Sequence, residues 1–338
     1  MFLVHTSSTH APLLARAVVS ACRGDGWLSA LQPQLMHKLF NLVLQQNLNI
    51  DKLEPVTRSE VAAALSSHEE RMELIQLMCA MEILCPEVPE SMEAEVEGWA
   101  EALDVEEPSL LFLRDLALGQ AAQAQHDFYR LNWIGDLDHR HPEFAQVLQR
   151  LGEPARANTL EDDDVVFEKW QALETYPVGS LGRCLAEFYK LRKFTWPGRI
   201  GSANEAVAQH DWIHLVADYG TTPLGEIEVT SFQASCSESP GATLGVIGAL
   251  GLFESGAFVG SHITSPQINQ GLSLPGGMER MAEAILRGKA CNTDLLNFDF
   301  FRVADQPIET VRASFGIPAK SEAVSNWDPY GAMRLSAN

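Results

Sequence analysis

Residues 210–226 read His-Asp-Trp-Ile-His-Leu-Val-Ala-Asp-Tyr-Gly-Thr-Thr-Pro-Leu-Gly-Glu. His210 and His214 stand four positions apart, so a helix places both imidazoles on one face. Asp211 follows the first histidine directly, and eleven residues separate His214 from Glu226. The stretch therefore predicts two helices joined by a tight turn, with candidate metal ligands on both.

The turn between these two helices has a recognisable end. Thr222 is a good N-cap and Pro223 suits the first helical position, so a new helix is predicted to begin there. Glu226 then lies in the first turn of this second helix and can supply a metal ligand that faces the two histidines. The histidine pair belongs to a helix predicted over residues 205–218.

Four side chains in this stretch can share one divalent ion: His210, Asp211, His214 and Glu226. Nitrogen and oxygen ligands without a thiolate suit zinc, and also manganese or iron, whereas two imidazoles argue against calcium and magnesium. We therefore expect Zn²⁺ as the cofactor. Asp211 occupies the place of the glutamate in the His-Glu-x-x-His motif, which disfavours a metalloprotease. The other interpretation is a chance pair of surface histidines on a helix.

The whole pattern, His-Asp-x-x-His with eleven residues to a glutamate, resembles the signature of the coenzyme Q biosynthesis protein four family, in which the four matching residues bind zinc. The likeness covers about residues 165–318. Further segments that look like those of the family are residues 176–183, 188–189, 225–229, 287–289 and 307–312.

This resemblance implies a zinc-dependent lyase of ubiquinone biosynthesis. Its reaction would remove the C1 carboxyl group from a polyprenylated hydroxybenzoate and install a hydroxyl there, with Asp211 and Glu226 as the catalytic carboxylates. An open metal position can hold a phenolate or carboxylate oxygen and withdraw charge from the ring. Glu228 is a candidate for a spare carboxylate, although we expect it on a solvated face.

An apolar stretch follows at residues 241–260, in which Glu254 is the only charged residue. Gly241, Gly245 and Ala249 form a ridge of small residues on a predicted helix. Two interpretations stay open, a buried helix-packing seam and a groove for a long isoprenoid chain. A transmembrane span is less favoured, because glycine and alanine dominate. The residues predicted to contact substrate or lipid are Leu244, Ile247, Gly248 and Phe253.

Residues 11–135 carry helical periodicity throughout, and the chain has no alternating apolar and polar runs joined by hairpin turns. We predict an all-α protein with two helical domains, at residues 1–138 and 165–338, joined by a linker at 139–164. The C-terminal domain is predicted to be a helical bundle with the metal site between two of its helices.

The N-terminal part has a resemblance of its own. Residues 99–105, Trp-Ala-Glu-Ala-Leu-Asp-Val, precede Pro108 and are similar to the tellurite-resistance protein B-like helical domain. The metal-associated Asp-Gly break of that family has its nearest match at Asp25 and Gly26, with no counterpart in the second half of this region. We therefore expect a structural or interaction module rather than a second metal site.

The charge balance limits the partners. The chain of 338 residues holds 24 Lys and Arg against 45 Asp and Glu, a net charge of −21. This charge repels nucleic acid, and we expect no nucleic-acid binding. The expected partners are a polyprenylated aromatic or prenyl lipid, other quinone-biosynthesis proteins, a second copy of the chain and the membrane surface.

The six cysteines form no Cys-x-x-Cys pair, and most lie in apolar or helical stretches, which is typical of reduced thiols in a cytosolic protein. The start of the chain lacks a basic segment leading into an apolar run, so we expect no secretory signal. We expect a cytoplasmic protein of bacterial type, peripheral on the inner face of the membrane, with the mitochondrial matrix as the alternative. His126, Asp127, His139 and His141 are expected on the surface.

Two other functions stay open. A non-catalytic protein could bind a prenyl lipid or organise quinone-biosynthesis enzymes as a scaffold, with the metal holding two helices together. A hydrolase of the His-Asp phosphohydrolase kind would need an upstream histidine and a distal aspartate, for which the sequence offers no matching set.

Overall fold

The computed structural model describes residues 1–338 except 25, 136–141, 240, 259–269, 328–330 and 334–338. The described residues form helices and contain no β-strand, which confirms the predicted all-α fold. Asp25, His139 and His141, to which the sequence analysis gave roles, lie outside the described residues.

Helices fill the N-terminal half of the chain. They are α1 (Ala11–Cys22), α2 (Leu31–Lys38), α3 (Arg58–Ala64), α4 (His68–Ile83), α5 (Glu90–Leu103), α6 (Pro108–Ala117) and α7 (Ala121–Leu131), with a π-helical turn at Leu39–Val43 and a 3-10 turn at Ile50–Lys52. Local capping starts them: the Thr57 hydroxyl accepts from the Glu60 amide while the Glu60 carboxylate accepts from the Thr57 amide, so α3 begins at the next residue.

The C-terminal half is also helical. Its helices are α9 (Pro142–Leu151), α10 (Asp164–Gln171), α11 (Leu181–Arg192), α12 (Glu205–Ala217), α13 (Pro223–Cys236), α14 (Ala242–Leu250), α15 (Gly277–Ala290), α16 (Ile308–Ser314) and α17 (Glu322–Trp327). Shorter helical turns lie at Glu153–Arg156, Ala172–Thr175, Gly251–Ser255, Gly271–Ser273 and Phe300–Val303.

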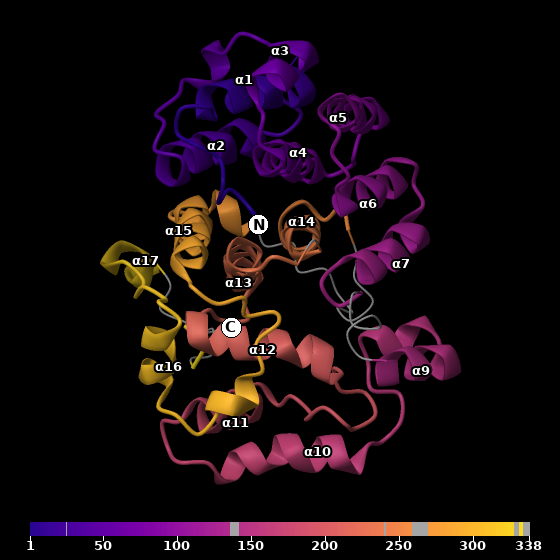
Figure 1. Ribbon diagram of the computed structural model, residues 1–338, viewed down its shortest axis with the longest axis vertical. Coiled ribbons are helices and arrows are strands. Elements are labelled where there is room, and N and C mark those ends of the chain that lie inside the picture. The colour runs from indigo at the N-terminus through magenta and orange to yellow at the C-terminus, as the bar shows by residue number, and fades with distance from the viewer. Residues whose placement is uncertain (25, 136–141, 240, 259–269, 328–330, 334–338) are drawn as a thin grey trace.

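Helices α13, α14 and α15 occupy the middle of the molecule, between the N-terminal helices and the group α10, α11, α12 and α16 (Figure 1). Helix α14 packs against α4, α6 and α7, and α15 packs against α2. One hydrophobic core cluster includes Ile83 and Trp99 from the first half and Trp212 and Ile247 from the second. The packing therefore crosses between the two predicted domains, whose division at residues 139–164 stays a prediction.

The apolar stretch that begins at Gly241 forms a short helix. Helix α14 spans nine residues, all of them buried, and continues as the π-helical turn Gly251–Ser255. Throughout the described part of the chain, no helix has both the length and the apolar composition that crossing a bilayer requires.

A buried ion pair joins α13 to α15. Glu228 has no exposed surface, and its two carboxylate oxygens accept from Arg280, at 3.0 Å from Nε and 2.6 Å from Nη2. The prediction that Glu228 lies on a solvated face was therefore wrong. Helix α15 covers that face of α13, and the periodicity of one helix does not reveal which neighbours cover it.

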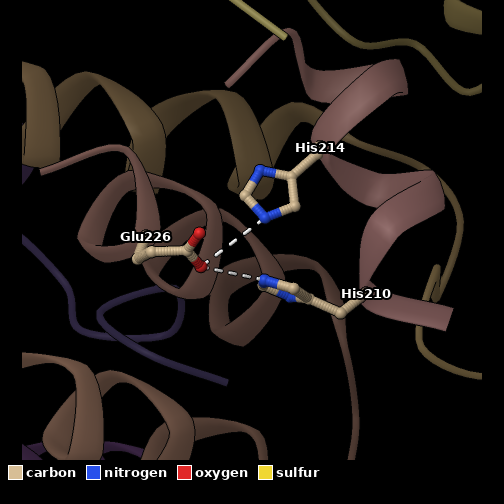
Figure 2. Close-up of side chains that lie close together, drawn as sticks. All are labelled: His210, His214 and Glu226. Carbon is tan, nitrogen blue, oxygen red and sulfur yellow. Dashed lines mark hydrogen bonds and ion pairs between the residues drawn. The ribbon is translucent and has the colours of Figure 1, made fainter. Parts of the chain in front are cut away.

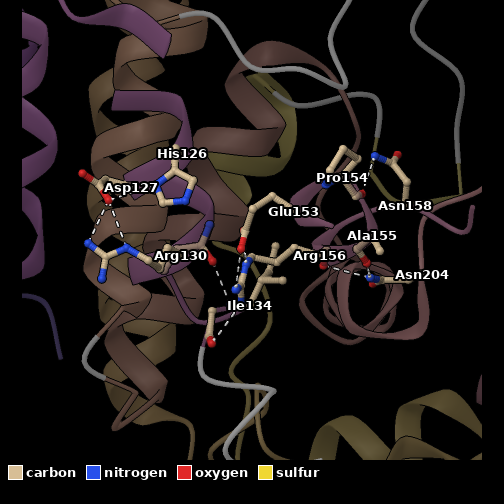
Figure 3. A network of polar contacts seen from close by, with 12 residues as sticks. His126, Asp127, Arg130, Ile134, Glu153, Pro154, Ala155, Arg156, Asn158 and Asn204 are labelled. Atoms are coloured by element: carbon tan, nitrogen blue, oxygen red, sulfur yellow. Dashed lines mark hydrogen bonds and ion pairs between the residues drawn. The ribbon is translucent and has the colours of Figure 1, made fainter. Parts of the chain in front are cut away.

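The prediction that Asp127 lies on the surface was also wrong. Its side chain is buried and accepts from Gln123 and from both Nε and Nη2 of Arg130 (Figure 3). His126 beside it is exposed, as predicted. A helix–helix contact explains the difference, because α6 packs on α7.

Residues inside the predicted linker connect α7 to α12. Arg156 donates from Nη1 to the Gly135 carbonyl at 3.3 Å, just beyond α7. Asn204, which caps α12, donates to the carbonyls of Ala155 and Arg156 at 3.0 and 2.8 Å (Figure 3). The start of α12 is therefore held by hydrogen bonds to residues 155 and 156.

Candidate metal centre

Helix α12 carries the two histidines. Its N-cap is Asn204, whose Oδ1 accepts from the amides of Ala206 and Val207 at 3.1 Å. The helix ends at Ala217, so the helix predicted over 205–218 is confirmed. The spacing of four residues brings the rings of His210 and His214 to the same face, with their centroids 4.5 Å apart.

Helix α13 carries the glutamate and begins as predicted. Thr222 is its N-cap, accepting from the Gly225 amide at 3.1 Å, and Pro223 is its first residue. Gly225 is required because a Cβ there would lie 2.2 Å from the Gly220 carbonyl oxygen. Glu226 stands in the first turn, where the free amides and the helix dipole favour a carboxylate.

Three of the four predicted ligands converge. Oε2 of Glu226 lies 3.2 Å from Nε2 of His210 and 3.5 Å from Nε2 of His214 (Figure 2). Candidate ligand atoms of these three residues all lie within 4.8 Å of one another. His214 is buried, whereas His210 and Glu226 keep 17% and 20% of their side chains exposed, so the group can be reached from one side.

The outer nitrogen of each ring has an acceptor. Nδ1 of His214 lies 3.1 Å from the Tyr219 carbonyl oxygen, which can only accept, so Nδ1 carries the proton. Nδ1 of His210 lies 2.8 Å from Oε1 of Gln233, a buried residue on α13. Both Nε2 atoms then face Glu226 and are the nitrogens left to bind a metal, which would take the place of the proton that His210 carries in its ion pair with Glu226.

Sequence reasoning missed Gln233 and the Tyr219 carbonyl. Gln233 stands seven positions after Glu226, which is two turns along the same face of one helix, and this spacing was a usable signal. No sequence signal pointed to the Tyr219 carbonyl, because the direction of a backbone carbonyl there depends on how the chain leaves α12.

Asp211 does not join the three-residue group. Its Oδ2 accepts from the Tyr189 hydroxyl at 2.6 Å, and Tyr189 lies on α11. Tyr189 belongs to one of the segments that prompted the family resemblance, although no role was assigned to it. The role of Asp211 as a metal ligand stays a prediction.

The electrostatics of the group favour an ion pair. Burial opposes the ionisation of Glu226, but attraction to His214 and His210 outweighs it and lowers the pKa of the carboxyl. For His210, burial works against the charged form, yet Glu226 and Asp211 raise the pKa of the imidazole. Burial raises the pKa of Asp211, against the opposing hydrogen bond from Tyr189.

One cation borders the group. Arg192 lies at the end of α11, where Nε donates to the Thr221 hydroxyl at 3.0 Å and the guanidinium sits 3.8 Å over the Phe188 ring. Burial lowers the pKa of Arg192, while the negative charges of Glu226 and Asp211 oppose that shift. The positive charge of Arg192 therefore interacts with both Glu226 and the neighbouring Asp211.

Two imidazole nitrogens and one carboxylate oxygen fit a transition-metal ion. Hard cations such as calcium and magnesium prefer sites made of oxygen alone. The same set of two imidazoles and one carboxylate binds zinc in metalloproteases and non-haem iron in oxygenases. The residues present therefore suit a divalent metal of this kind, and the donor set by itself leaves zinc, iron and manganese open.

The residues predicted to contact lipid lie on or next to α14. Leu244 and Ile247 are fully buried, and Phe253 is half-buried against the core. At Gly248 a Cβ would lie 2.1 Å from the Phe128 ring, so an aromatic side chain of α7 occupies the space that the glycine leaves. This contact has the form of a packed helix seam, one of the two interpretations of the stretch.

No family model matches the chain, and no curated protein matches it. Among solved structures, the chain is similar to a candidate ubiquinone biosynthesis protein from Nostoc punctiforme, with 16% identity and a TM-score of 0.34 over 72% of this chain and 97% of that one.

Proposed function

We propose that this chain is a metal-dependent enzyme of ubiquinone biosynthesis that removes the C1 carboxyl group from a polyprenylated hydroxybenzoate. The observation that carries the proposal is the convergence of His210, His214 and Glu226 on one point. Both Nδ1 atoms make hydrogen bonds to other groups, which leaves the Nε2 atoms for a metal. The family resemblance of the motif supplies the substrate class. Zn²⁺ is the proposed metal.

The proposed roles follow from the contacts. A metal held by the three residues would act as a Lewis acid toward a phenolate or carboxylate oxygen. Glu226 and Asp211 are the proposed catalytic carboxylates, and the Arg192 guanidinium provides a positive charge beside them for an anionic substrate. Installing a hydroxyl at C1 further requires an oxidant such as dioxygen from outside the chain.

A cavity along α11 has a size that suits an aromatic ring. It is an open cavity of about 380 Å³ whose lining includes Tyr189, Phe194 and Trp196 and also the charged residues Glu174, Arg183, Glu187 and Lys190. Small-molecule sites typically start at about 300 Å³ and are lined by aromatic side chains. None of His210, His214 and Glu226 lines the cavity, and its link to the group is Tyr189, whose hydroxyl donates to Asp211. A prenyl chain along Leu244, Ile247, Gly248 and Phe253 would require the Phe128 ring to move.

The test combines metal analysis with a carbon dioxide assay. Purified protein should contain about one metal ion per chain and should release labelled carbon dioxide from a carboxyl-labelled polyprenyl hydroxybenzoate. Glu226→Ala should abolish release and retain part of the metal. Glu95→Ala is the matched control, because Glu95 on α5 pairs with Arg58 on α3 and belongs neither to the metal group nor to the lining of the cavity.

Two outcomes would contradict the proposal. Absence of bound metal after dialysis against zinc, iron and manganese would remove its basis. If folded Glu226→Ala protein sustained normal quinone levels in cells that depend on this chain, the non-catalytic prenyl-lipid-binding or scaffold function would replace it. Mass spectrometry of lipid that co-purifies separates these cases, since a bare prenyl or acyl lipid favours a carrier.

A further inference from the structure

Two cysteines lie at the same end of a pair of packed helices. Cys236 is the last residue of α13, and Cys291 is the first residue after α15. The two helices pack against each other (Figure 1). They run in the same direction, because the ion pair of Glu228 with Arg280 joins their first halves and their last turns also touch. The two cysteines are therefore brought together where both helices end.

Contacts on both sides of the two cysteines fix how closely the chain segments approach. Before them, a Cβ at Gly288 would lie 2.8 Å from the Cβ of Ser235, so the two backbones nearly touch. Beyond them, Oδ2 of Asp294 accepts from the Glu238 amide at 3.4 Å. The first cysteine follows Ser235 directly, and the second lies about one helical turn after Gly288. Their side chains share the space between these two contacts.

The two thiols interact directly and differ in access. Cys236 is buried, whereas Cys291 is partly exposed. Sγ of Cys236 lies 3.6 Å from the Gln233 carbonyl oxygen, and Sγ of Cys291 lies 3.4 Å from that of Thr293. A hydrogen bond from Cys236 lowers the pKa of the Cys291 thiol. The same contact, together with burial, raises the pKa of Cys236. The pair therefore combines an accessible thiol that ionises more readily with a buried thiol that stays protonated.

This combination is the one that redox-sensing cysteines have. Such a cysteine is accessible, has a lowered pKa and stands beside a second cysteine that can resolve its oxidised form. The other four cysteines differ, because burial raises the pKa of each of them; they are Cys22, Cys79, Cys85 and Cys184. An oxidant should therefore select Cys291.

We propose that Cys236 and Cys291 form a redox-active pair, which hydrogen peroxide converts to a disulfide and a thiol reductant restores. A disulfide joins Cα atoms about 4.4 to 6.8 Å apart, and the close approach of α13 and α15 suits this requirement. The inference goes beyond the proposed function, because it involves neither the metal group nor its substrate.

The oxidation has two steps. In the first, the Cys291 thiolate attacks one oxygen of hydrogen peroxide, the O–O bond breaks, and the sulfur becomes a sulfenic acid. The hydroxide that leaves takes up the proton released by the thiol and becomes water. In the second, the sulfur of Cys236 attacks the sulfenic sulfur, the S–O bond breaks, and the oxygen leaves as water with the Cys236 proton. Two thiols lose two electrons in total, and one peroxide is reduced to two molecules of water.

Thiol counting tests the pair on the whole chain. The six cysteines of the reduced protein should each take up one maleimide in denaturant. After treatment with hydrogen peroxide, and its removal by catalase, four should react, because the disulfide uses two of the six. Dithiothreitol should restore all six. Mass spectrometry of a digest made without reductant should find one cross-linked pair of peptides, which contains Cys236 and Cys291.

Serine variants separate the roles of the two thiols. Cys236→Ser removes the resolving thiol, so Cys291 should stop at the sulfenic acid and become labelled by dimedone. Cys291→Ser removes the attacking thiol, and its remaining cysteines should all stay reduced. Cys184→Ser is the matched control, because Cys184 is also partly exposed, and this variant should lose two thiols as the wild type does.

Three outcomes would overturn the proposal. The wild type could keep all six thiols at a peroxide concentration that oxidises a model dithiol, the cross-linked peptides could contain another cysteine, or Cys291→Ser could lose two thiols as the wild type does. If a serine variant does not fold, peptide mapping of the wild type decides the question alone. Because the experiment uses neither metal nor substrate, its result is independent of the proposed decarboxylation.

Discussion

Each histidine of the group depends on an acceptor that fixes its ring. For His214 the acceptor is a backbone carbonyl, which no substitution removes directly, whereas for His210 it is the side chain of Gln233. Partners of this kind orient the ring and set which nitrogen is free to bind metal. A substitution at Gln233 can therefore change the orientation of the His210 ring while His210 itself is kept.

Replacing Gln233 should weaken metal binding. In Gln233→Leu the Nδ1 atom of His210 loses its acceptor, and we expect the zinc affinity to fall by about 10-fold to 100-fold. Competition titration against a fluorescent chelator measures this. Gln233→Glu keeps an acceptor at the same distance and should bind zinc at least as tightly as the wild type. Equal affinities for the Leu and Glu variants would contradict the role given to Gln233.

The ion pair of the metal-free group predicts a pH dependence. The pKa of His210 is raised from its ordinary 6.5, so its stabilisation is present below that value and is lost as the pH rises through the folded-state pKa. The pKa of Glu226 is lowered from 4.5, so its stabilisation is present above that value and is lost as the pH falls through the folded-state pKa. The pair therefore stabilises the fold most between these two ordinary values.

With a chelator present, wild type should exceed Glu226→Gln in stability by on the order of 1 kcal/mol at mildly acidic pH and by less at alkaline pH. Urea unfolding at both pH values measures the difference. A difference that grows with rising pH would show that the two histidines do not pair with Glu226. Saturating zinc should reverse the trend, because the metal takes the place of the His210 proton.

At the scale of single helices, glycines on α14 determine how closely its neighbours approach. A Cβ at Gly248 would lie 2.1 Å from Phe128, whereas a Cβ at Gly245 would lie 3.8 Å from its nearest neighbour, Trp133. The first position has no room for a methyl group, and the second has ordinary contact distance. The two glycines stand on the same buried helix, which makes them a matched pair.

Alanine at these two positions should act in opposite directions. Gly248→Ala should destabilise the protein by about 1 to 3 kcal/mol, because the Phe128 ring must shift. Gly245→Ala should be neutral or should stabilise by about 0.5 to 1 kcal/mol, because alanine favours the helix. Thermal unfolding compares them. A tolerated Gly248→Ala would instead indicate free space along α14, as an isoprenoid groove requires.

At the scale of the whole molecule, the helices that hold the metal group and the N-terminal helices share one core. Ile83 at the end of α4 has side-chain atoms 3.0 Å from the Cβ position of Gly251, in the turn that continues α14. An ion pair between Nζ of Lys38 and Oε1 of Glu279, 2.5 Å apart, joins α2 to α15. Contacts of this kind make the stability of one part depend on the other.

We therefore expect both parts to unfold together. Ile83→Ala should lower the free energy of unfolding by about 2 to 5 kcal/mol, and hydrogen exchange should show the same loss in α1 and α4 as in α12 and α13. Val165→Ala, at an exposed position on α10, is the control. It should change neither the free energy of unfolding nor the hydrogen exchange of these helices. If only the N-terminal helices lost protection, the two predicted domains would be independent folding units.

Local sequence determined the helical class, the histidine spacing and the start of α13. These features depend on backbone geometry over a few residues: the pitch of a helix sets the His210–His214 pair, and Thr222 with Pro223 sets a helix start. Once both helices were predicted, a carboxylate in the first turn of the second one was a reasonable partner for the imidazoles.

Tertiary structure alone decided which partners the side chains of these helices find. Gln233 reaches His210 because α13 lies against α12, Tyr189 takes Asp211 because α11 packs on the other flank, and Glu228 is buried because α15 covers it. Each of these contacts joins residues that are 22 to 52 positions apart. Periodicity shows which face of a helix is apolar, but the packing of the whole chain determines which helix covers that face.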